Sequence, residues 1–456
     1  MIVMKFGGTS LESAAALEQV AAIVRARLDR RPVVVVSAMG KTTNALLAIA
    51  ADAAGGKREQ ALGQLCALRE YHRSEAAPAV SETDRKELDG ILEEHFGELA
   101  EIIKGLALLG ELTPRSLDAV ASYGERVSSR IVALVLRKSG IASVPLDSRR
   151  LVVTDQRHTQ AAALLPETYA RASAAISQLS GEQVAVMGGF IGSTEDGVTT
   201  TLGRGGSDYT AALVGAALGA EEIQIWTDVD GVLTCDPALV PDAHPVKTLS
   251  FDEAAELAYF GAKVLHPATV VPAREKNIPV RIMNSRRPDA PGTRIVADRS
   301  PCANVMKSVA CKRNIAVVNI HSTRMLMAHG FLRRIFEVFD RYETPVDMLA
   351  TSEVSVSLTI DNPARLDEIC AELQPFAEVF VERDQAIVCV VGDNLRYTPG
   401  VAARVFGALQ DVNVRMISQG ASLLNLGFVV AARDLPRAAA SLHREFFTKL
   451  DPAVFG

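Results

Sequence analysis

Apolar residues form short runs that alternate with longer helical patterns over roughly the first 297 residues. The clearest runs are residues 2–6, 32–36, 184–187 and 223–226. Such short runs, rich in β-branched residues, are typical of strands covered on both faces. Between them the apolar residues recur at helical spacing, and residues 57–138 have few strand signals. Strands alternating with helices predict an α/β domain with a mainly parallel sheet.

A polar segment rich in arginine, proline and glycine, residues 286–292, ends this pattern. Proline and glycine in such a cluster mark a loop, so we place a domain edge a few residues later. The sequence therefore predicts a first domain at residues 1–297 and a second region at residues 298–456.

The second region contains an internal duplication. In each copy a predicted strand leads to a glycine, a helix and two further strands, and each glycine (Gly330, Gly400) precedes a phenylalanine by six residues. The predicted strands are 315–321, 345–349 and 354–360, then 386–391, 412–417 and 424–430. The first helix is expected to pack through Leu332, Ile335, Phe336 and Phe339. Neither copy can bury much surface alone, so we expect the two to lie side by side.

Composition narrows the class of protein. The chain is 48% hydrophobic and 22% charged with a net charge of −6, and the lack of a basic block argues against nucleic acid as a partner. The longest nearly apolar run, residues 211–220, is too short to cross a membrane, and the first residues lack a secretory signal pattern. Six cysteines without a CxxC pair indicate mostly buried thiols in a reducing compartment. We therefore expect a cytoplasmic protein.

The segment most informative about chemistry is residues 199–211, TTTLGRGGSDYTA. Glycines let the backbone approach a ligand closely, and the N-terminus of the helix that follows favours an anion. Arg204 adds a guanidinium that grips a carboxylate or phosphate through two parallel hydrogen bonds. Asp208 stands where it can organise a metal or a lysine. Together these residues predict a site that handles two anions.

Three further loops, at residues 5–10, 37–44 and 188–192, follow predicted strands. Ligands of open α/β sheets bind at the carboxyl ends of the strands, so these loops are candidates for the same site. Lys5 beside two glycines suits a lysine that neutralises a transferring phosphoryl group, and equally a solvated surface lysine. No segment matches GxxxxGK[ST], which excludes a P-loop, and Asp208 breaks a GxGxxG dinucleotide motif.

Five motifs, in order, resemble the aspartate kinases of the amino acid kinase superfamily. They are KFGGTS at 5–10, SYGE at 122–125, TTLGRGGSDYTA at 200–211, WTDVDG at 226–231 and FGAKVLHP at 260–267. The resemblance covers almost the whole chain. It implies an amino acid kinase fold with helices on both faces of a mainly parallel sheet. Two ferredoxin-like ACT units are expected to follow, at about 315–384 and 385–456, with residues 298–314 completing the second.

The resemblance implies a reaction as well. The γ-phosphoryl of ATP would pass to the side-chain carboxylate of L-aspartate, giving 4-phospho-L-aspartate, the entry to lysine, methionine and threonine synthesis. ATP and Mg²⁺ are the implied cofactors, with Mg²⁺ held mainly by ATP oxygens and no dedicated protein metal site. The length is similar to that of the monofunctional enzymes.

Site residues carry over by matching motif. Lys5 and Asp208 are the implied catalytic pair: Lys5 stabilises charge on the phosphoryl group, and Asp208 orients the cationic groups. The implied aspartate-binding residues are Thr43, Glu125, Arg204 and Ser207. Glu125 would meet the substrate ammonium and Arg204 a carboxylate. The implied nucleotide-binding residues are Lys5, Gly7, Gly8, Ser10, Thr227, Asp228 and Lys263.

The chain departs from the family pattern at two positions. Where the family usually has a tyrosine, and then an arginine after Asp-Pro, this chain has Leu233 and Ala238. Leu233 removes a ring and a hydroxyl near the nucleotide, and Ala238 removes a cation that faces the phosphates. Either weaker ATP binding or a substitute residue would follow.

The ACT units imply regulation. The segment similar to the effector site of lysine-sensitive enzymes comprises Met325, Gly330, Phe331, Leu332, Val346, Asp347, Thr351, Ser352 and Glu353. Asp347 and Glu353 would bind the ammonium groups of an effector. Lysine is the expected effector, with threonine or no effector as alternatives. ACT units also imply a homodimer, and dimers that pair further would form a tetramer.

Two other functions compete with this one. One is a different amino acid kinase, acting on glutamate or acetylglutamate, against which Glu125 and the paired ACT units argue. The other is a non-catalytic amino-acid sensor on the same fold. Retention of Lys5, Arg204 and Asp208 argues against a sensor, whereas Leu233 and Ala238 favour it.

Overall fold

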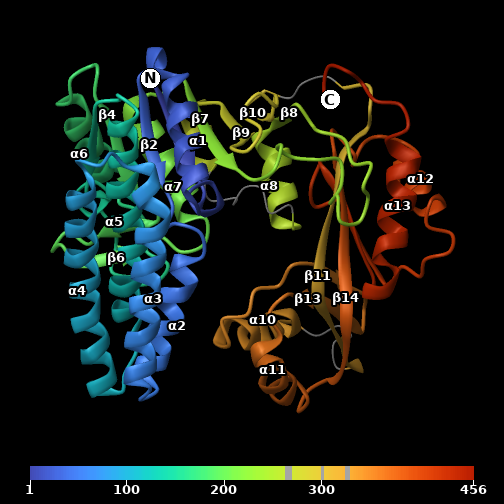
Figure 1. The fold of residues 1–456 in the computed structure, drawn as a ribbon. Helices are drawn as coiled ribbons and strands as arrows, with labels where there is room; N and C mark the ends of the chain where they lie inside the picture. Colours follow the sequence, from blue (N-terminus) through green and yellow to red (C-terminus); the bar gives the residue numbers. More distant parts are fainter. Residues whose placement is uncertain (262–269, 299–301, 324–328) are drawn as a thin grey trace. The chain divides into compact units, whose positions relative to one another are not determined.

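The computed structural model describes residues 1–261, 270–298, 302–323 and 329–456. The chain forms two compact units (Figure 1). The first comprises Met1–Val232, Lys247–Phe251 and Val264–Asp298, and the second comprises Leu233–Val246, Asp252–Lys263 and Arg299–Gly456. Each unit is described by itself below.

The first unit is an α/β domain. Its strands are β1 (Ile2–Phe6), β2 (Pro32–Val36), β3 (Ser143–Leu146), β4 (Val184–Gly188), β5 (Ile191–Ser193), β6 (Thr199–Thr201), β7 (Glu222–Thr227), β8 (Thr248–Ser250), β9 (Val280–Asn284) and β10 (Thr293–Val296). Its helices are α1 (Ala14–Arg25), α2 (Thr42–Ala54), α3 (Arg58–Ala76), α4 (Arg85–Leu109), α5 (Pro114–Lys138), α6 (Leu165–Ser177), α7 (Gly206–Leu218) and α9 (Val270–Glu275).

One sheet forms the centre of this unit, in the order β3-β4-β2-β1-β7-β9-β10-β8. Neighbouring strands are parallel except for the β9–β10 pair. All residues of β1 and β2 are buried, as expected for strands covered on both faces. The mainly parallel α/β sheet predicted from the alternation of apolar runs is confirmed.

Helices cover both faces of the sheet. On one face α5 packs on β2, β3 and β4, and a bundle of α2, α3 and α4 packs against α5 (Figure 1). On the other face α7 packs on β1, β2 and β7 and is covered in turn by α6 and α9. The mainly helical character predicted for residues 57–138 is confirmed by α3, α4 and α5.

The second unit contains the duplicated region. Its elements are α8 (Phe251–Tyr259, whose first residue belongs to the other unit), β11 (Met306–His321), α10 (Phe331–Arg341), β12 (Leu349–Thr351), β13 (Ser355–Ile360), α11 (Leu366–Leu373), β14 (Glu378–Gly392), α12 (Val401–Gly407), β15 (Met416–Gln419), β16 (Asn425–Ala431) and α13 (Leu435–Phe446).

Two long central strands join the two copies into one sheet, in the order β12-β13-β11-β14-β16-β15. The second half of β11 pairs with β13, whereas its first half pairs with the second half of β14, which also pairs with β16. Residues 306–312 thus serve the second copy and residues 315–321 the first. The side-by-side packing of the copies is confirmed.

Some local predictions in this unit were wrong. The buried face of α10 is Phe331, Ile335, Val338 and Phe339, whereas Leu332 and Phe336 are each 38% exposed. The predicted strands at 345–349 and 412–417 lie too early, since β12 begins at Leu349 and β15 at Met416. Short edge strands have one neighbour each, so apolar pattern alone locates them poorly.

Two segments before residue 298 belong to the second unit by their contacts. In one, the Val309 backbone N–H donates to the Thr234 carbonyl over 2.8 Å. In the other, Glu253 of α8 and Lys307 of β11 form an ion pair with both side chains 0% exposed and N–O distances of 3.0 Å. We propose that the main boundary between the two domains lies at residues 297/298. The two segments described above precede this boundary in the sequence but belong to the second unit.

All six cysteines are free thiols. Only Cys235 and Cys389 are buried, and Cys66 is exposed, so the prediction of mostly buried thiols was too broad. Among the described residues, no helix is long and apolar enough to cross a membrane.

The buried pair in the second unit leads to a stability prediction. Lys307→Met leaves the Glu253 carboxylate buried without its cation, and the free energy of unfolding should fall by about 3–5 kcal/mol. Replacing both residues, in Lys307→Met with Glu253→Leu, should restore much of the loss. Denaturant unfolding followed by circular dichroism measures both.

The matched control is the ion pair of the exposed Arg437 with Asp434, where Arg437→Ala should change the free energy of unfolding by less than about 1 kcal/mol. Equal losses in Lys307→Met and Arg437→Ala would contradict a structural role for the buried pair.

Candidate active site

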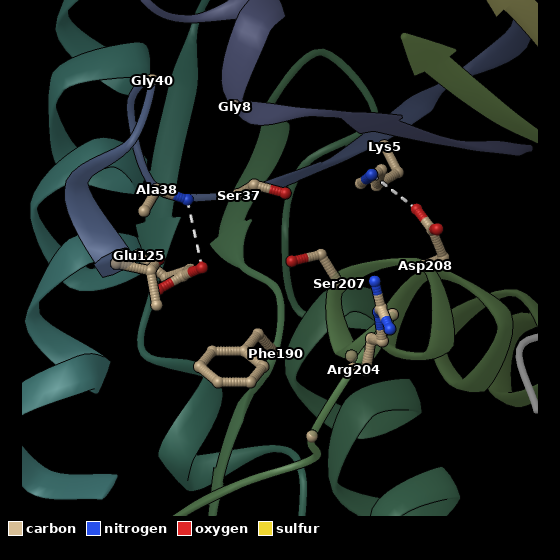
Figure 2. Close-up of a pocket in the computed structure, with 14 residues that line it drawn as sticks. Lys5, Gly8, Ser37, Ala38, Gly40, Glu125, Phe190, Arg204, Ser207 and Asp208 are labelled. Carbon is tan, nitrogen blue, oxygen red and sulfur yellow. Dashed lines mark hydrogen bonds and ion pairs between the residues drawn. The ribbon is translucent and has the colours of Figure 1, made fainter. Parts of the chain in front are cut away.

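A cavity of about 310 Å³ lies at the carboxyl ends of β1, β2 and β4 (Figure 2). Its walls come from four loops that follow strands, from α5 and from the start of α7. The lining residues are Lys5, Gly8, Ser37, Ala38, Gly40, Thr43, Glu125, Phe190, Gly203, Arg204, Gly205, Gly206, Ser207 and Asp208. This position agrees with the rule for ligand sites in open α/β sheets.

Lys5, near the end of β1, and Asp208, in the first turn of α7, point towards each other on one side of the cavity (Figure 2). Lys5 Nζ lies 2.5 Å from Asp208 Oδ1, and the two side chains are only 11% and 14% exposed. Of the two interpretations of Lys5, the solvated surface lysine is thereby excluded. The ammonium lines the cavity and is held in place by its carboxylate partner.

The glycine-rich turn brings the N-terminus of α7 to the cavity. Gly203 and Gly205 have φ values of 73° and 74°, a left-handed conformation that side chains disfavour. Gly206, Ser207 and Asp208 open the helix and line the cavity. The free backbone N–H groups and the dipole of this helix end favour an anion.

Glu125 of α5 lies on another wall of the cavity and is 3% exposed. Its Oε1 accepts a hydrogen bond from the Ala38 backbone N–H over 3.1 Å (Figure 2). Its Oε2 is buried without a hydrogen-bond partner among the described residues. Burial raises the pKa of Glu125 to about 8, opposed by the Ala38 N–H and the charge of Lys5. A cationic ligand group would satisfy the free oxygen.

The remaining aspartate-binding candidates also line the cavity. Arg204 is exposed and forms no ion pair with any residue in the described ranges, so its guanidinium is available to a ligand. Thr43 and Ser207 are half-buried and present hydroxyl groups. The structure therefore brings together Lys5, Gly8, Thr43, Glu125, Arg204, Ser207 and Asp208, all from the predicted set.

Four predicted nucleotide-binding residues lie outside the cavity lining, at the adjacent carboxyl ends of β1 and β7. The Gly7 N–H donates to the Trp226 carbonyl over 3.0 Å, and Ser10 Oγ lies 2.7 Å from Ser285 Oγ. The Ser285 N–H and Oγ donate to the Thr227 carbonyl, and Thr227 Oγ1 donates to Asp228. These residues share a strand edge with the cavity without enclosing it.

Lys263 of the nucleotide set lies outside the described residues. Leu233 and Ala238, the departures from the family pattern, lie in the second compact unit, where the Ala238 N–H donates to Asp236. Trp226 is 0% exposed and stacks on Phe6, so it belongs to the core.

Sequence reasoning flagged the loops at 37–44 and 188–192 without singling out Ser37 or Phe190, which both line the cavity. Phe190 has a φ of 65°, rare for a residue with a large side chain, and its N–H donates to Thr210 Oγ1 over 3.0 Å. The signal in the sequence that could have identified Phe190 is its position as a bulky residue among the glycines of residues 188–192.

Asp118 was missed altogether. It lies seven residues before Glu125 on α5, on the same helix face, and its side chain is 0% exposed. Its carboxylate accepts hydrogen bonds from the Thr159 N–H, from Thr201 Oγ1 over 2.6 Å and, over 2.7 Å, from His158 Nδ1. Thr201 precedes Arg204 by three residues. Asp118 thus anchors the base of the glycine-rich turn to α5.

The predicted effector residues lie in the second unit, except that Met325 is outside the described residues. Gly330 (φ 79°) precedes α10, Phe331 is buried, Leu332 is 38% exposed and Val346 is half-buried. Thr351 ends β12, Ser352 and Glu353 lie between β12 and β13, and all three are exposed. The Asp347 side chain is 4% exposed and already holds an internal cation, Lys312.

Among the described residues, no group of three His, Cys, Asp or Glu side chains is placed to hold a metal ion. In the cavity, Asp208 already holds Lys5, and Glu125 is buried against Ala38. The residues present fit a Mg²⁺ ion carried mainly by nucleotide oxygens rather than by a protein cage.

Comparison with known proteins extends these observations. The sequence matches the amino acid kinase family over residues 1–284 and the ACT domain over residues 388–446. Aspartokinase 3, chloroplastic, of Arabidopsis thaliana is 41% identical over 98% of this chain and 81% of its own length. Lysine-sensitive aspartokinase 3 of Escherichia coli is 37% identical over 98% of this chain and 99% of its own length.

Solved structures agree. E. coli aspartokinase III in complex with aspartate and ADP (R-state) matches with a TM-score of 0.85 and 35% identity, over 98% of this chain and 100% of that chain. The same enzyme in complex with lysine and aspartate (T-state) matches with a TM-score of 0.81, over 98% of this chain and 99% of that one. The chain therefore belongs to the amino acid kinase family. Its full-length relatives place it among the aspartokinases within that family.

Glu125 generates a pH prediction. Below a pKa of about 8 the carboxyl is mostly protonated, and an ammonium ligand requires the carboxylate. The KM for an amino-acid substrate should therefore fall as the pH rises from 6.5 to 8.5, with a proton released on binding. Glu125→Gln should raise this KM about 100-fold and abolish its pH dependence. Steady-state kinetics across pH measure both, with the KM for ATP as the internal control.

The raised pKa of Glu125 also predicts how the stability of the folded protein changes with pH. Its folded pKa lies above the ordinary value of 4.5, so the folded protein loses stability as the pH rises from 4.5 through 8. The free Glu125→Gln protein should therefore be the more stable of the two at pH 9, by a few kcal/mol, and similar at pH 4.5. A mutant less stable at pH 9 would contradict the buried, uncompensated carboxylate.

Asp118 generates a positioning prediction. Asp118→Asn removes charge-assisted hydrogen bonds and should cost about 2–3 kcal/mol of unfolding free energy. It should also lower kcat/KM for the amino-acid substrate about tenfold at a temperature where the variant is folded, because Arg204 loses its anchored base. Thr201→Val removes one of the bonds and should produce a smaller effect of the same kind. Lost stability with unchanged kcat/KM would leave Asp118 a purely structural role.

Proposed function

We propose that this protein transfers the γ-phosphoryl group of ATP to the side-chain carboxylate of L-aspartate, producing 4-phospho-L-aspartate and ADP. The observation that carries the proposal is one cavity that holds Lys5, Arg204 and the partnerless oxygen of Glu125. These three groups complement a small molecule with two carboxylates and one ammonium. The E. coli relative that matches along its length was solved with aspartate and ADP.

In the proposed binding mode, Glu125 takes the substrate ammonium, because its buried Oε2 needs a donor. Arg204 takes the α-carboxylate through two parallel hydrogen bonds, and Thr43 and Ser207 supply hydroxyl groups. The side-chain carboxylate then extends towards Lys5 and the start of α7. A substrate without the ammonium would leave Glu125 buried and unpaired, which supports selectivity for an amino acid.

The chemical step needs no general base, since the nucleophile is an ionised carboxylate. One carboxylate oxygen forms a bond to the γ-phosphorus while the bond to the β,γ-bridging oxygen breaks and ADP leaves with that electron pair. The main barrier is repulsion between two anions. Lys5 lowers it by placing its ammonium at the transferring group, and the N–H groups of α7 add a second electropositive wall. Asp208 holds Lys5 in place.

Mg²⁺, when bound with the nucleotide, would neutralise charge on the β- and γ-phosphates. We propose that the nucleotide extends from the cavity towards Gly7, Ser10, Thr227 and Asp228, which lie along the neighbouring strand edge. Lys263 belongs to the same proposal. Leu233 and Ala238 contribute neither ring nor cation to it.

We further propose that lysine inhibits the enzyme through the first ACT unit. The E. coli relatives are lysine-sensitive by name and were solved with lysine and aspartate. Binding through Asp347 and Glu353 fits an effector with two ammonium groups. Leu332 and Phe336, half-exposed one turn apart on α10, support a homodimer through the ACT units, with a tetramer as a further assembly.

The test is acyl-phosphate formation, trapped as the hydroxamate, with Mg-ATP and L-aspartate. Product is expected with aspartate and not with glutamate or acetylglutamate. Lys5→Met should lower kcat by about 1,000-fold or more, because the ammonium acts in the transition state. The exposed Lys57→Met is the matched control and should keep wild-type rates. No product with aspartate would favour another acceptor or a sensor, and a fully active Lys5→Met would remove Lys5 from the mechanism.

A further inference from the structure

The first ACT unit contains a lysine that already occupies a proposed effector residue. Lys312 of β11 places Nζ 2.7 Å from Asp347 Oδ1 and 2.9 Å from Asp361 Oδ2. Its side chain is 18% exposed, and Asp347 is 4% exposed. The same ammonium lies 5.3 Å from the ring centre of Tyr259, at the end of α8. One internal cation therefore joins two carboxylates and an aromatic ring.

The cluster is not saturated. Asp347 Oδ2 is buried without a hydrogen-bond partner among the described residues. Burial raises the pKa of Asp347, although Lys312 opposes the shift. Burial alone would lower the pKa of Lys312, but its hydrogen bonds to Asp347 and Asp361 raise it. The buried carboxylate thus has one unused oxygen, but an incoming ammonium that pairs with both oxygens must first displace Lys312.

The cluster is also fixed to the end of α8. Gly261 has a φ of 110°, and a Cβ atom there would overlap the carbonyl oxygen of Cys311, next to Lys312. No other residue type fits this approach without a shift of the strand. The charge of Asp347, together with burial, raises the pKa of Tyr259 to about 12, which places the phenol close to the same carboxylate. A displacement of Lys312 is therefore expected to change the packing around Tyr259 and Gly261.

We propose that Lys312 is a tethered competitor of the effector: its ammonium holds Asp347 in the free protein, and an amino acid with a side-chain ammonium binds Asp347 only by displacing it. The inference rests on the proposed effector role of Asp347. With this competition, the strength of the Lys312 ion pairs determines the effector concentration needed for inhibition.

The competition has a consequence for selectivity. Threonine has no side-chain ammonium and cannot replace Lys312 at Asp347, so it leaves the cluster intact. A displaced Lys312 would also leave the ring of Tyr259.

The experiment compares wild type with Lys312→Met, which keeps the length of the side chain and removes the ammonium. Lysine binding is measured by isothermal titration calorimetry and lysine inhibition by the hydroxamate assay, with threonine and L-norleucine as probes lacking the ammonium. Lys312→Met should bind lysine roughly tenfold more tightly and be half-inhibited at a correspondingly lower concentration. Norleucine and threonine should show no such gain.

Two further variants control for folding and charge. Lys312→Arg keeps a cation on Asp347 and should bind lysine like wild type. Asp361→Asn removes an exposed second anchor of Lys312 without touching Asp347, and it should tighten lysine binding by a smaller factor. Unchanged or weaker lysine binding in both Lys312→Met and Asp361→Asn would overturn the proposal.

The outcomes separate this proposal from the proposed function. Calorimetry reports the competition even if no aspartate turnover is found. Turnover without lysine binding in either wild type or Lys312→Met would leave the kinase standing and overturn the competition. Lysine binding by Lys312→Met alone would mean that the internal cation locks the effector out.

Discussion

The ion pair between Lys5 and Asp208 is the interaction on which the site depends. It joins β1, at the centre of the sheet, to α7, the helix that packs on β1 from one face. Both side chains are largely buried, and each charge offsets the cost of burying the other. The partner must be short and at a helix start, so that the same helix end also faces the incoming anion. This ion pair therefore helps to fix the start of α7 beside the end of β1.

The rest of the site follows from how the sheet presents its loops. Parallel strands bring their carboxyl ends to one edge, so loops from distant parts of the chain meet there. α5 completes the arrangement from the other face, since it carries Glu125 into the cavity and Asp118 under the glycine-rich turn. Both carboxylates are buried, but only Asp118 is fully hydrogen-bonded. One helix face thus carries a carboxylate whose hydrogen bonds are satisfied and a second with one oxygen that has no partner among the described residues.

Much of the first unit could be predicted from the sequence because its signals are local. Uniformly apolar runs marked buried strands, and the glycines around Arg204 marked a turn with left-handed backbone. The nucleotide set was harder. Ser10 and Thr227 were assigned by resemblance, and the structure places them beside the cavity rather than in its lining. No spacing rule distinguishes a loop that encloses a ligand from its neighbour on the same strand edge.

What could not be predicted depends on tertiary pairing. Asp118 has an ordinary helical context, and only its partners across 41 and 83 residues reveal its role. Likewise Asp347 was recognised as an effector candidate, but nothing local indicated that Lys312 of the preceding strand would hold it. On α10, Leu332 and Phe336 fit the apolar spacing of a core-facing helix but are half-exposed. Such spacing does not distinguish a helix face that packs in the core from one that binds a partner. Buried polar networks and surfaces for partners are properties of the assembled fold.

The most direct test of the central claim is a crystal structure of the protein with L-aspartate, Mg²⁺ and a non-hydrolysable ATP analogue. The account predicts the substrate ammonium at Glu125 Oε2 and a substrate carboxylate on Arg204. It also predicts the γ-phosphate analogue between Lys5 Nζ and the first N–H groups of α7. Aspartate bound outside this cavity, or a γ-phosphate remote from Lys5 with the Lys5–Asp208 pair undisturbed, would contradict it.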